Sequence, residues 1–303
     1  MLKTMNHVSH ARDGARIARP FGWLGALVLT AAAFAAAYWF FVLTPVGQQI
    51  DENTLVGAHR YLEQQDIARE PALAFLGKLP QVSAVLGAVS LLVSALVHRS
   101  VAAPLINLAG MGGAFLTTQV LKHAVLDRPN LGISEATVNS FPSGHTTLAS
   151  ASMVAIFCMV TPRWRPLVAC LGGVYAALAG AATLVLGWHR PADIVGAYLV
   201  VVWWSLATGW VLTLATPRWN RWRTLRFWGA ARGWRFAMQV PGLLALVAAA
   251  CLFVLLPPVE TGENFKLLLG FLAAGILMIG GAALTLFGLM NQVFMHQSRE
   301  RGR

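Results

Sequence analysis

The sequence predicts an all-helical, polytopic membrane protein with about eight transmembrane spans. Composition is the first reason: 57% of the 303 residues are hydrophobic and only 12% are charged, with a mean hydropathy of +0.61, whereas soluble domains carry about 25% charged residues. The second reason is the length of the apolar runs, because each is near the ~20 residues that cross a bilayer as a helix. These runs cover approximately residues 22–46, 79–97, 101–121, 146–162, 166–187, 193–215, 237–256 and 267–290.

The first apolar run, residues 22–46, follows a polar and basic segment at residues 1–21. A cleaved signal peptide begins in the same way, but its apolar core is usually only ~7–15 residues long. We therefore predict an uncleaved transmembrane helix after a cytoplasmic N-terminus. The next segment, residues 47–78, is polar and rich in acidic residues. We expect a short amphipathic helix there, from the spacing of Leu55, Tyr61, Leu62 and Phe75.

The later runs divide into a core unit that ends at residue 215 and a C-terminal part, residues 237–303, with two further spans and a basic tail. Between them, residues 216–236 interleave Arg with Trp and Phe. A groove for single-stranded nucleic acid can have this composition. A cytoplasmic loop in the headgroup layer fits better, because Trp favours that layer and Arg pairs with anionic lipids. We therefore expect membrane lipids, and no nucleic acid, as partners.

The distribution of cationic residues predicts the orientation of the chain in a cell membrane. If both termini are cytoplasmic, alternating spans place 16 of the 23 Lys and Arg residues in cytoplasmic segments, in agreement with the positive-inside rule. Lys122, Arg128 and Arg190 are among the few cations on the opposite side. Topology does not favour positive charge there, so these three residues indicate an anionic ligand.

Three polar segments share this extracytoplasmic face in the predicted topology. They are residues 122–130, 139–146 and 188–193, which all lie in connections from an odd-numbered to an even-numbered span. Their common location follows from the alternation of spans alone, and it predicts one polar site at the outer membrane surface.

His189 and Asp193 form the first candidate pair within this site. Pro191 suits the first turn of a helix, which would place Asp193 in that turn, close to His189. A carboxylate there can accept the Nδ1–H of the imidazole and leave Nε2 free as a nucleophile. The alternative is an interfacial histidine with an aspartate that caps the helix start.

The stretch Pro142-Ser143-Gly144-His145-Thr146 directly precedes an apolar run. Gly144 allows a close backbone approach, and the following helix offers free N–H groups and a positive dipole end to a phosphate. Ser143 adds a hydroxyl donor, and His145 could protonate a leaving oxygen. The alternative is a simple turn and N-cap before a transmembrane helix.

Lys122 and Arg128 complete the set of candidates. Both could extend to the membrane surface without further function. They could equally neutralise an oxyanion, for which Arg offers a planar, bidentate fork.

The order Lys…Arg-Pro, Pro-Ser-Gly-His and His-x-x-x-Asp resembles the type 2 phosphatidic acid phosphatase (PAP2) and vanadium haloperoxidase superfamily. The resemblance covers approximately residues 50–213, so that residues 22–215 would form a PAP2-like six-helix core. It implies a phosphohistidine intermediate on His189, Asp193 as its partner and His145 as general acid. It also implies that Lys122, Arg128, Ser143 and Gly144 bind the phosphoryl oxygens, with neither a metal nor another cofactor.

The chain departs from the family pattern at two points. The family usually places its Lys seven residues before the Arg, whereas Lys122 is six residues before Arg128. The family also carries Ser-Arg before the nucleophilic histidine, where this chain has Ala182 and Thr183. Our hypothesis is that Arg190 or His123 partly replaces the missing guanidinium.

The function that these features predict is metal-independent hydrolysis of a lipid phosphate or diphosphate at the extracytoplasmic face. The substrates that the resemblance implies are polyprenyl phosphates and diphosphates such as undecaprenyl diphosphate, phosphatidic acid and phosphatidylglycerophosphate. The substitution at Thr183 supports an alternative, a catalytically weak relative that binds or transports a phosphorylated lipid. Vanadate-dependent halide oxidation is a third reading, which the membrane setting disfavours. The sequence does not indicate an oligomeric state.

Overall fold

The computed structural model describes residues 20–64, 69–98, 101–134, 138–216, 219, 227–257 and 264–297. Within these ranges the chain forms helices and connecting loops, with no strand. The all-α prediction is therefore confirmed. In chain order the helices are α1 (Pro20–Leu43), α2 (Pro45–Glu63), α3 (Arg69–His98), α4 (Ala102–Val120), the π-helix η1 (Leu121–Val125), α5 (Gly144–Met159), α6 (Arg165–Val185), α7 (Pro191–Ala215), α8 (Phe227–Leu255) and α9 (Phe265–Gln297).

Six helices in the described part of the chain are long and apolar enough to cross a membrane: α1, α3, α6, α7, α8 and α9. The chain is thus a multi-pass membrane protein. The predicted eight spans included two more runs, which correspond to α4 and α5. These two do not qualify by length and composition, because α5 has only 16 residues and α4 contains polar residues such as Asn107 and Gln119.

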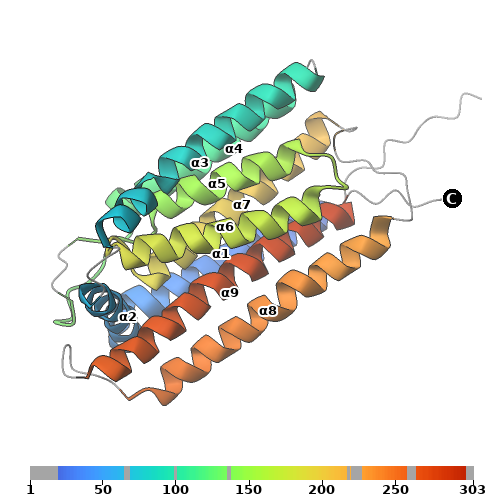
Figure 1. The fold of residues 1–303 in the computed structure, drawn as a ribbon. Helices are drawn as coiled ribbons and strands as arrows, with labels where there is room; N and C mark the ends of the chain where they lie inside the picture. The colour runs from blue at the N-terminus through green and yellow to red at the C-terminus, as the bar shows by residue number, and fades with distance from the viewer. Residues whose placement is uncertain are drawn as a thin grey trace, which may run out of the picture.

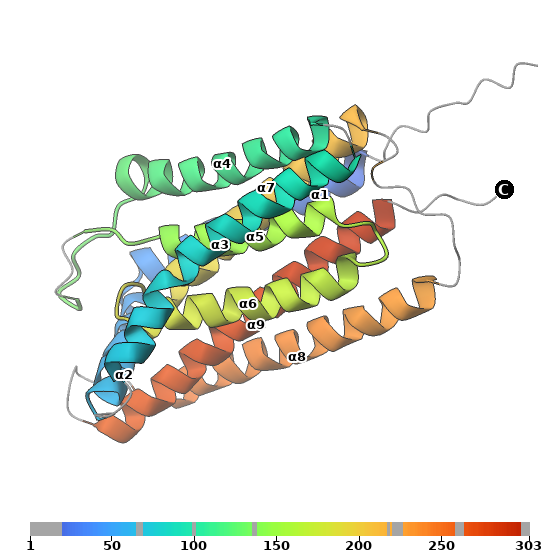
Figure 2. The same ribbon diagram turned by 45° about the horizontal axis from the view of Figure 1, so that its top comes forward.

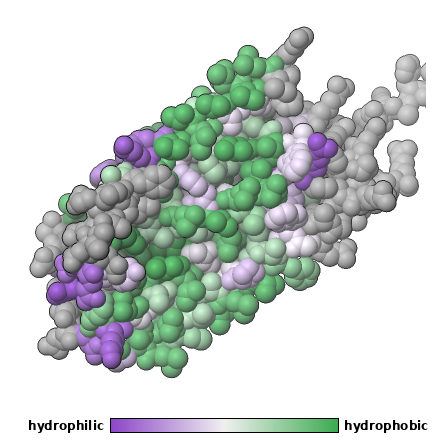
Figure 3. All heavy atoms as spheres, viewed as in Figure 1, coloured by the Kyte–Doolittle hydropathy of each residue, from purple (hydrophilic) through white to green (hydrophobic). Residues whose placement is uncertain are grey.

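The helices form an elongated bundle, and α2 lies at one of its ends (Figure 1). After rotation, α4 lies along one side of the bundle and α8 along the other, and α3 crosses the front of the bundle obliquely toward α2 (Figure 2). Apolar side chains cover much of the visible long side, whereas hydrophilic ones gather toward the ends (Figure 3). This distribution fits a bundle whose sides face lipid and whose ends face water.

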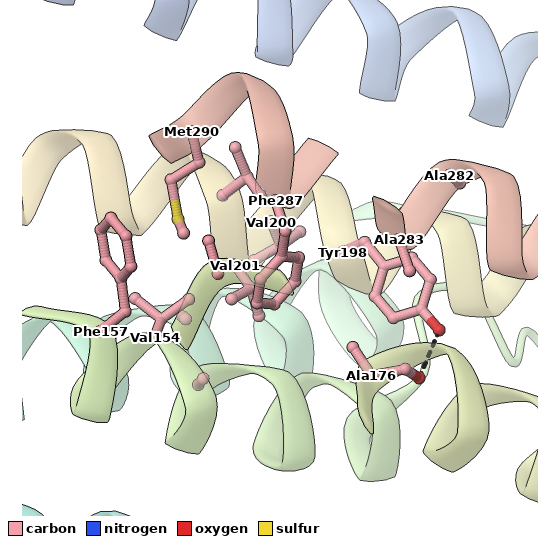
Figure 4. Packing of buried hydrophobic residues seen from close by; sticks show 14 of the residues in the cluster. Val154, Phe157, Ala176, Tyr198, Val200, Val201, Ala282, Ala283, Phe287 and Met290 are labelled. Atoms are coloured by element: carbon pink, nitrogen blue, oxygen red, sulfur yellow. Dashed lines mark hydrogen bonds between the residues drawn. The ribbon is translucent and has the colours of Figure 1, made fainter. Parts of the chain in front are cut away.

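The core of the bundle is built around α7 and α9. α7 packs against α1, α4, α5 and α9, and α9 also contacts α2 and α6. Phe287 and Met290 of α9 share one buried cluster with Val154 and Phe157 of α5 (Figure 4). α8 packs mainly against α9, so one of the two C-terminal helices is buried and the other is peripheral.

Two predicted segments lie partly outside the described residues. One is the basic N-terminus, of which residues 1–19 are not described, and the other is the basic aromatic loop at residues 216–236, of which residues 217–218 and 220–226 are not described. α8 already begins at Phe227, well before the predicted start of the seventh span at residue 237.

The chain starts a second helix directly after α1, where the sequence predicted a longer first span and then a polar segment. The residue before a proline disfavours helical geometry, and Thr44 accordingly adopts an extended conformation before Pro45. Its Oγ1 accepts a hydrogen bond from the N–H of Gly47 at 3.1 Å. The Thr-Pro pair therefore ends α1 at Leu43 and caps α2.

The amphipathic helix expected in residues 47–78 is present as α2, and some of its polar residues are buried. Asp51 and Asn53 are fully buried, whereas Tyr61 is 44% exposed. Phe75 belongs to α3 instead. These polar residues are buried because α2 lies over the polar loops at the end of the bundle, where its carboxylates and amides find partners.

Gly180 of α6 makes a close approach that allows a first prediction. A Cβ at this position would overlap Tyr198 Oη and crowd Ile194, and Tyr198 Oη donates to the carbonyl oxygen of Ala176 at 2.6 Å (Figure 4). Gly180→Ala should therefore overpack the core, at a cost of about 1–3 kcal/mol. The expected result is a lower midpoint of thermal unfolding for the purified protein in detergent.

Gly280 of α9 provides the matched control. A Cβ there would meet no atom within 4 Å. Gly280→Ala should keep or raise the midpoint, because alanine favours helix over glycine. Equal midpoints for the two variants would contradict the close contact of Gly180 with Tyr198.

Candidate active site

The three polar segments singled out in the sequence meet at the end of the bundle where α2 lies (Figure 1). The backbone N–H of Ser143 donates to the carbonyl oxygen of Asp193 at 2.9 Å, which joins the start of α5 to the start of α7. Asn139 Nδ2 donates to the carbonyl oxygens of Leu126 and Phe141, each at 2.9 Å. These bonds hold the loop between η1 and α5 against both helix starts.

His189 and Asp193 lie side by side where α7 begins. Nδ1 of His189 is 3.5 Å from Oδ2 of Asp193, and their side chains are 6% and 0% exposed. Asp193 Oδ2 also accepts hydrogen bonds from the backbone N–H of Arg190 at 3.0 Å and from Ser140 Oγ at 2.6 Å. Asp193 thus caps α7 and faces His189 at the same time. Because Nδ1 faces the carboxylate, Nε2 is the nitrogen left for chemistry.

Ser143 is the N-cap of α5. Its Oγ accepts a hydrogen bond from the N–H of Thr146 at 3.3 Å and donates to Thr146 Oγ1 at 3.0 Å. The side chain is fully buried, so its hydroxyl is engaged in the cap. Gly144 is the first residue of α5 and lies beside Gln119, whose Oε1 would be 3.5 Å from an added Cβ.

His145 projects from the first turn of α5 and is exposed. Its ring centroid lies 4.8 Å from that of Trp188 and 6.0 Å from that of His189. Partial burial lowers the pKa of His145, and the nearby His189 and Lys122 lower it further. The two histidines are therefore neighbours, as a nucleophile and a general acid would have to be.

Arg128 is buried beside both carboxylates of the site. Its side chain is 3% exposed, and Nη2 lies 3.7 Å from Asp51 Oδ2 and 3.7 Å from Asp193 Oδ1. These distances are too long for hydrogen bonds. Nε, Nη1 and Nη2 have no hydrogen-bond partner among the described residues. A buried guanidinium in this state is costly. The N–H donors of all three nitrogens are available to an anion.

Lys122 lies in the π-helix η1, which the N–H of Leu126 closes by donating to the carbonyl oxygen of Leu121 at 2.9 Å. A π-turn contains more residues than an α-turn and rotates the side chains relative to an α-helix. This local change accompanies the shortened spacing from Lys122 to Arg128. Lys122 is close enough to influence His145, and His123 is exposed on the same turn.

Arg190 is paired with an acidic residue of α2. Its Nε and Nη2 donate to Glu52 Oε2 at 2.8 and 2.7 Å, and Nη1 donates to Ser140 Oγ at 3.4 Å. The side chains of Arg190 and Glu52 are 5% and 12% exposed. The guanidinium thus binds the protein itself, next to the residues that it was expected to assist.

Thr183 occupies the position of the missing family arginine. Its Oγ1 donates to the carbonyl oxygen of Gly180 at 2.8 Å and lies 3.5 Å from Thr146 Oγ1. Its own carbonyl oxygen accepts from the N–H groups of Trp188 and His189, at 3.0 and 3.3 Å. Thr183 therefore helps to shape the loop that carries His189, but it brings no positive charge.

The sequence reasoning missed Asp51 and Glu52. Both were counted only as members of a polar, acid-rich segment, whereas Asp51 is fully buried and accepts the N–H of Ala192 at 3.0 Å. The helix start at Thr44-Pro45 was the available signal, because it places both acids on a helix directly after a span. In the described part of the chain, no group of three or more His, Cys, Asp or Glu residues is arranged to hold a metal ion.

The fold and the apolar helices define a multi-pass membrane protein with a polar site at one end of the bundle. Residues 103–225 match the family model of the PAP2 superfamily. This match is consistent with membership of the PAP2 superfamily, whose members are generally phosphatases acting on phosphate esters. The match includes every site residue described above except Asp51 and Glu52. No significant match was found among curated proteins or solved structures.

The pair of Glu52 and Arg190 allows a second prediction. Glu52→Gln removes the charge that compensates a buried guanidinium, and breaking such a pair costs about 3–5 kcal/mol. The variant should unfold at a clearly lower temperature than the wild type. Glu63 of the same helix is the control, because its contact with Arg60 is exposed and such pairs contribute little. If Glu52→Gln and Glu63→Gln had the same small effect, the structural role of Arg190 would be wrong.

Proposed function

We propose that the protein is a lipid phosphatase that hydrolyses a lipid phosphate or diphosphate through a phosphohistidine intermediate on His189. One observation supports this best: the buried pair of His189 and Asp193 lies beside Arg128, whose three nitrogens have no hydrogen-bond partner among the described residues. A nucleophile held by a carboxylate beside unused cationic donors is suited to phosphoryl transfer.

The proposed reaction has two steps. Arg128, Lys122 and the N-terminus of α5 hold the phosphoryl oxygens, and Nε2 of His189 attacks the phosphorus. The bond from phosphorus to the leaving oxygen breaks while His145 donates a proton to that oxygen. Asp193 stabilises the positive charge that forms on the His189 ring.

In the second step, water attacks the phosphorus of the phosphohistidine. His145, now neutral, accepts a proton from this water, and the bond from phosphorus to Nε2 breaks. Inorganic phosphate leaves, and both histidines return to their starting states.

The position of the site supports a lipid substrate. The site lies at one end of an apolar bundle, where headgroups meet water, so a lipid could keep its tail in the membrane while its phosphate reaches Arg128. The bias of Lys and Arg in the sequence supports an extracytoplasmic location.

Thr183 and Arg190 favour a second candidate, a protein that binds or transports a phosphorylated lipid with little turnover. The position of the family arginine carries an uncharged side chain, and Arg190 is paired with Glu52. Loss of one donor to a transferring group commonly costs ~10²–10³ in rate. The retained pair of His189 and Asp193 favours the enzyme, because a binding protein needs no oriented nucleophile.

The third prediction tests the enzyme directly. Purified protein with a chelator present should release phosphate from at least one member of a panel of lipid phosphates and diphosphates, and His189→Ala should abolish the release. The control is His296→Ala, because His296 is an exposed residue in the last turn of α9. Absence of release by the wild type would support the binding protein, and release by His189→Ala would exclude the phosphohistidine mechanism.

The fourth prediction concerns His145 as general acid. Its removal should slow hydrolysis of an alkyl phosphate by ~10²–10⁴, but should slow p-nitrophenyl phosphate less, because p-nitrophenolate leaves without a proton. The protonated form of His145 is lost as pH rises, so the rate of phosphorylation by alkyl substrates should fall. Because the pKa of His145 is lowered, this fall should begin at a lower pH than for an ordinary histidine. Equal losses with both substrates would assign His145 a different role.

A further inference from the structure

Asp51 lies at the centre of the site although it comes from α2, outside the matched region 103–225. It is fully buried. Oδ1 accepts the N–H of Ala192 at 3.0 Å, in the first turn of α7. Oδ2 lies 3.7 Å from Nη2 of Arg128 and has no hydrogen-bond partner among the residues described. The carboxyl group thus contacts both the start of α7 and the proposed anion-binding arginine.

Arg128 lies between two carboxylates that are held very differently. Asp193 accepts hydrogen bonds from Ser140 and from the backbone of Arg190, and it faces His189. Asp51 accepts one backbone hydrogen bond, at Oδ1. Asp193 is therefore well stabilised as an anion, and Asp51 is the carboxylate with fewer partners.

An anion that binds Arg128 adds negative charge next to both carboxylates. The charged groups that act on Asp51 are Asp193 and Arg190 at the start of α7, and Arg128 in the loop after η1. Like charges at short distance in a buried site favour protonation of one group. Burial, followed by the charge of Asp193, raises the pKa of Asp51 to about 7. The contacts and the charges agree that Asp51 is the group that gains the proton.

We propose that Asp51 is a positioning residue for Arg128, which it attracts as an ion pair without a hydrogen bond when the site is empty and releases to a bound anion by taking up one proton from solvent. No covalent bond changes in this step. The proposal rests on the proposed function only for the identity of the natural anion, which would be the phosphoryl group of the substrate. It predicts that anion affinity decreases as pH rises through the range in which Asp51 ionises.

The fifth prediction uses sulfate as the probe, because it remains a dianion near neutral pH and is not hydrolysed. Calorimetry of the full-length wild type in detergent should show sulfate affinity falling by about tenfold for each pH unit above the pKa of Asp51, from the linkage of one proton. Asp51→Asn keeps the acceptor for the N–H of Ala192 but cannot take up a proton. It should therefore bind sulfate with one proton fewer taken up than the wild type. Glu63→Gln, an exposed change on the same helix, should behave like the wild type.

Sulfate binding can also change the protonation of other groups, so the difference in proton uptake between the wild type and Asp51→Asn is the decisive quantity. Equal proton uptake by these two proteins would overturn the proposal. A second measurement needs only the wild type: difference infrared spectra should show the C=O stretch of a protonated carboxylic acid appearing when sulfate binds. Its absence would overturn the proposal even if Asp51→Asn did not fold.

Sulfate binding does not require turnover, which separates this proposal from the proposed function. A wild type that releases no phosphate, but binds sulfate with a proton that Asp51→Asn lacks, would refute the phosphatase and support the role of Asp51. A wild type that releases phosphate, but takes up no more protons than Asp51→Asn when sulfate binds, would support the phosphatase and refute the role of Asp51.

Discussion

The carboxylate of Asp193 is the group on which the arrangement of the site depends. Its Oδ2 accepts hydrogen bonds from Ser140 and from the backbone of Arg190, and it faces the ring of His189. Its Oδ1 faces Arg128, and its carbonyl oxygen accepts the N–H of Ser143. One residue in the first turn of α7 thus joins the three polar segments. Because the side chain of Asp193 is fully buried, the contacts of its carboxylate replace water that this group lost on folding.

The inward-facing acids of α2 explain why this helix lies at the end of the bundle. Buried carboxylates are costly unless each has a partner. Glu52 binds the guanidinium of Arg190, and Asp51 binds the N–H of Ala192, so both partners lie at the start of α7. The helix dipole favours negative charge there. Thr54 Oγ1 also donates to the carbonyl oxygen of Phe271 in α9, at 3.2 Å, which connects the site to the C-terminal part of the bundle.

The substitution at Thr183 changes how positive charge is distributed in the site. Thr183 uses its hydroxyl and carbonyl groups to hold the backbone around His189, and Arg190 is engaged by Glu52. Within the described site, Arg128 is the guanidinium whose donors lack partners. At low local dielectric, a single guanidinium still interacts strongly with an oxyanion. The carboxylate of Asp51 competes with the anion for Arg128, so ionisation of Asp51 should lower the affinity of the site for an anion.

The sequence by itself determined the helical class, most of the spans and the three segments that form the site. These features are local: apolar runs of bilayer length reveal the helices, and short motifs such as Pro-Ser-Gly-His or His-x-x-x-Asp carry their residue types with them. The pairing of Asp193 with His189 is local as well, because the two residues are only four positions apart in the sequence.

Only the tertiary structure decided which polar residues are buried and with which partners. Glu52 and Arg190 are 138 residues apart, and Asp51 and Ala192 are 141 residues apart, so no local pattern could relate them. For the same reason, hydropathy did not show that α9 lies in the core whereas α8 lies at its edge, since both contain an apolar stretch long enough to cross a membrane. The partner of a polar group is set by how the helices pack, and the packing joins segments from across the whole chain.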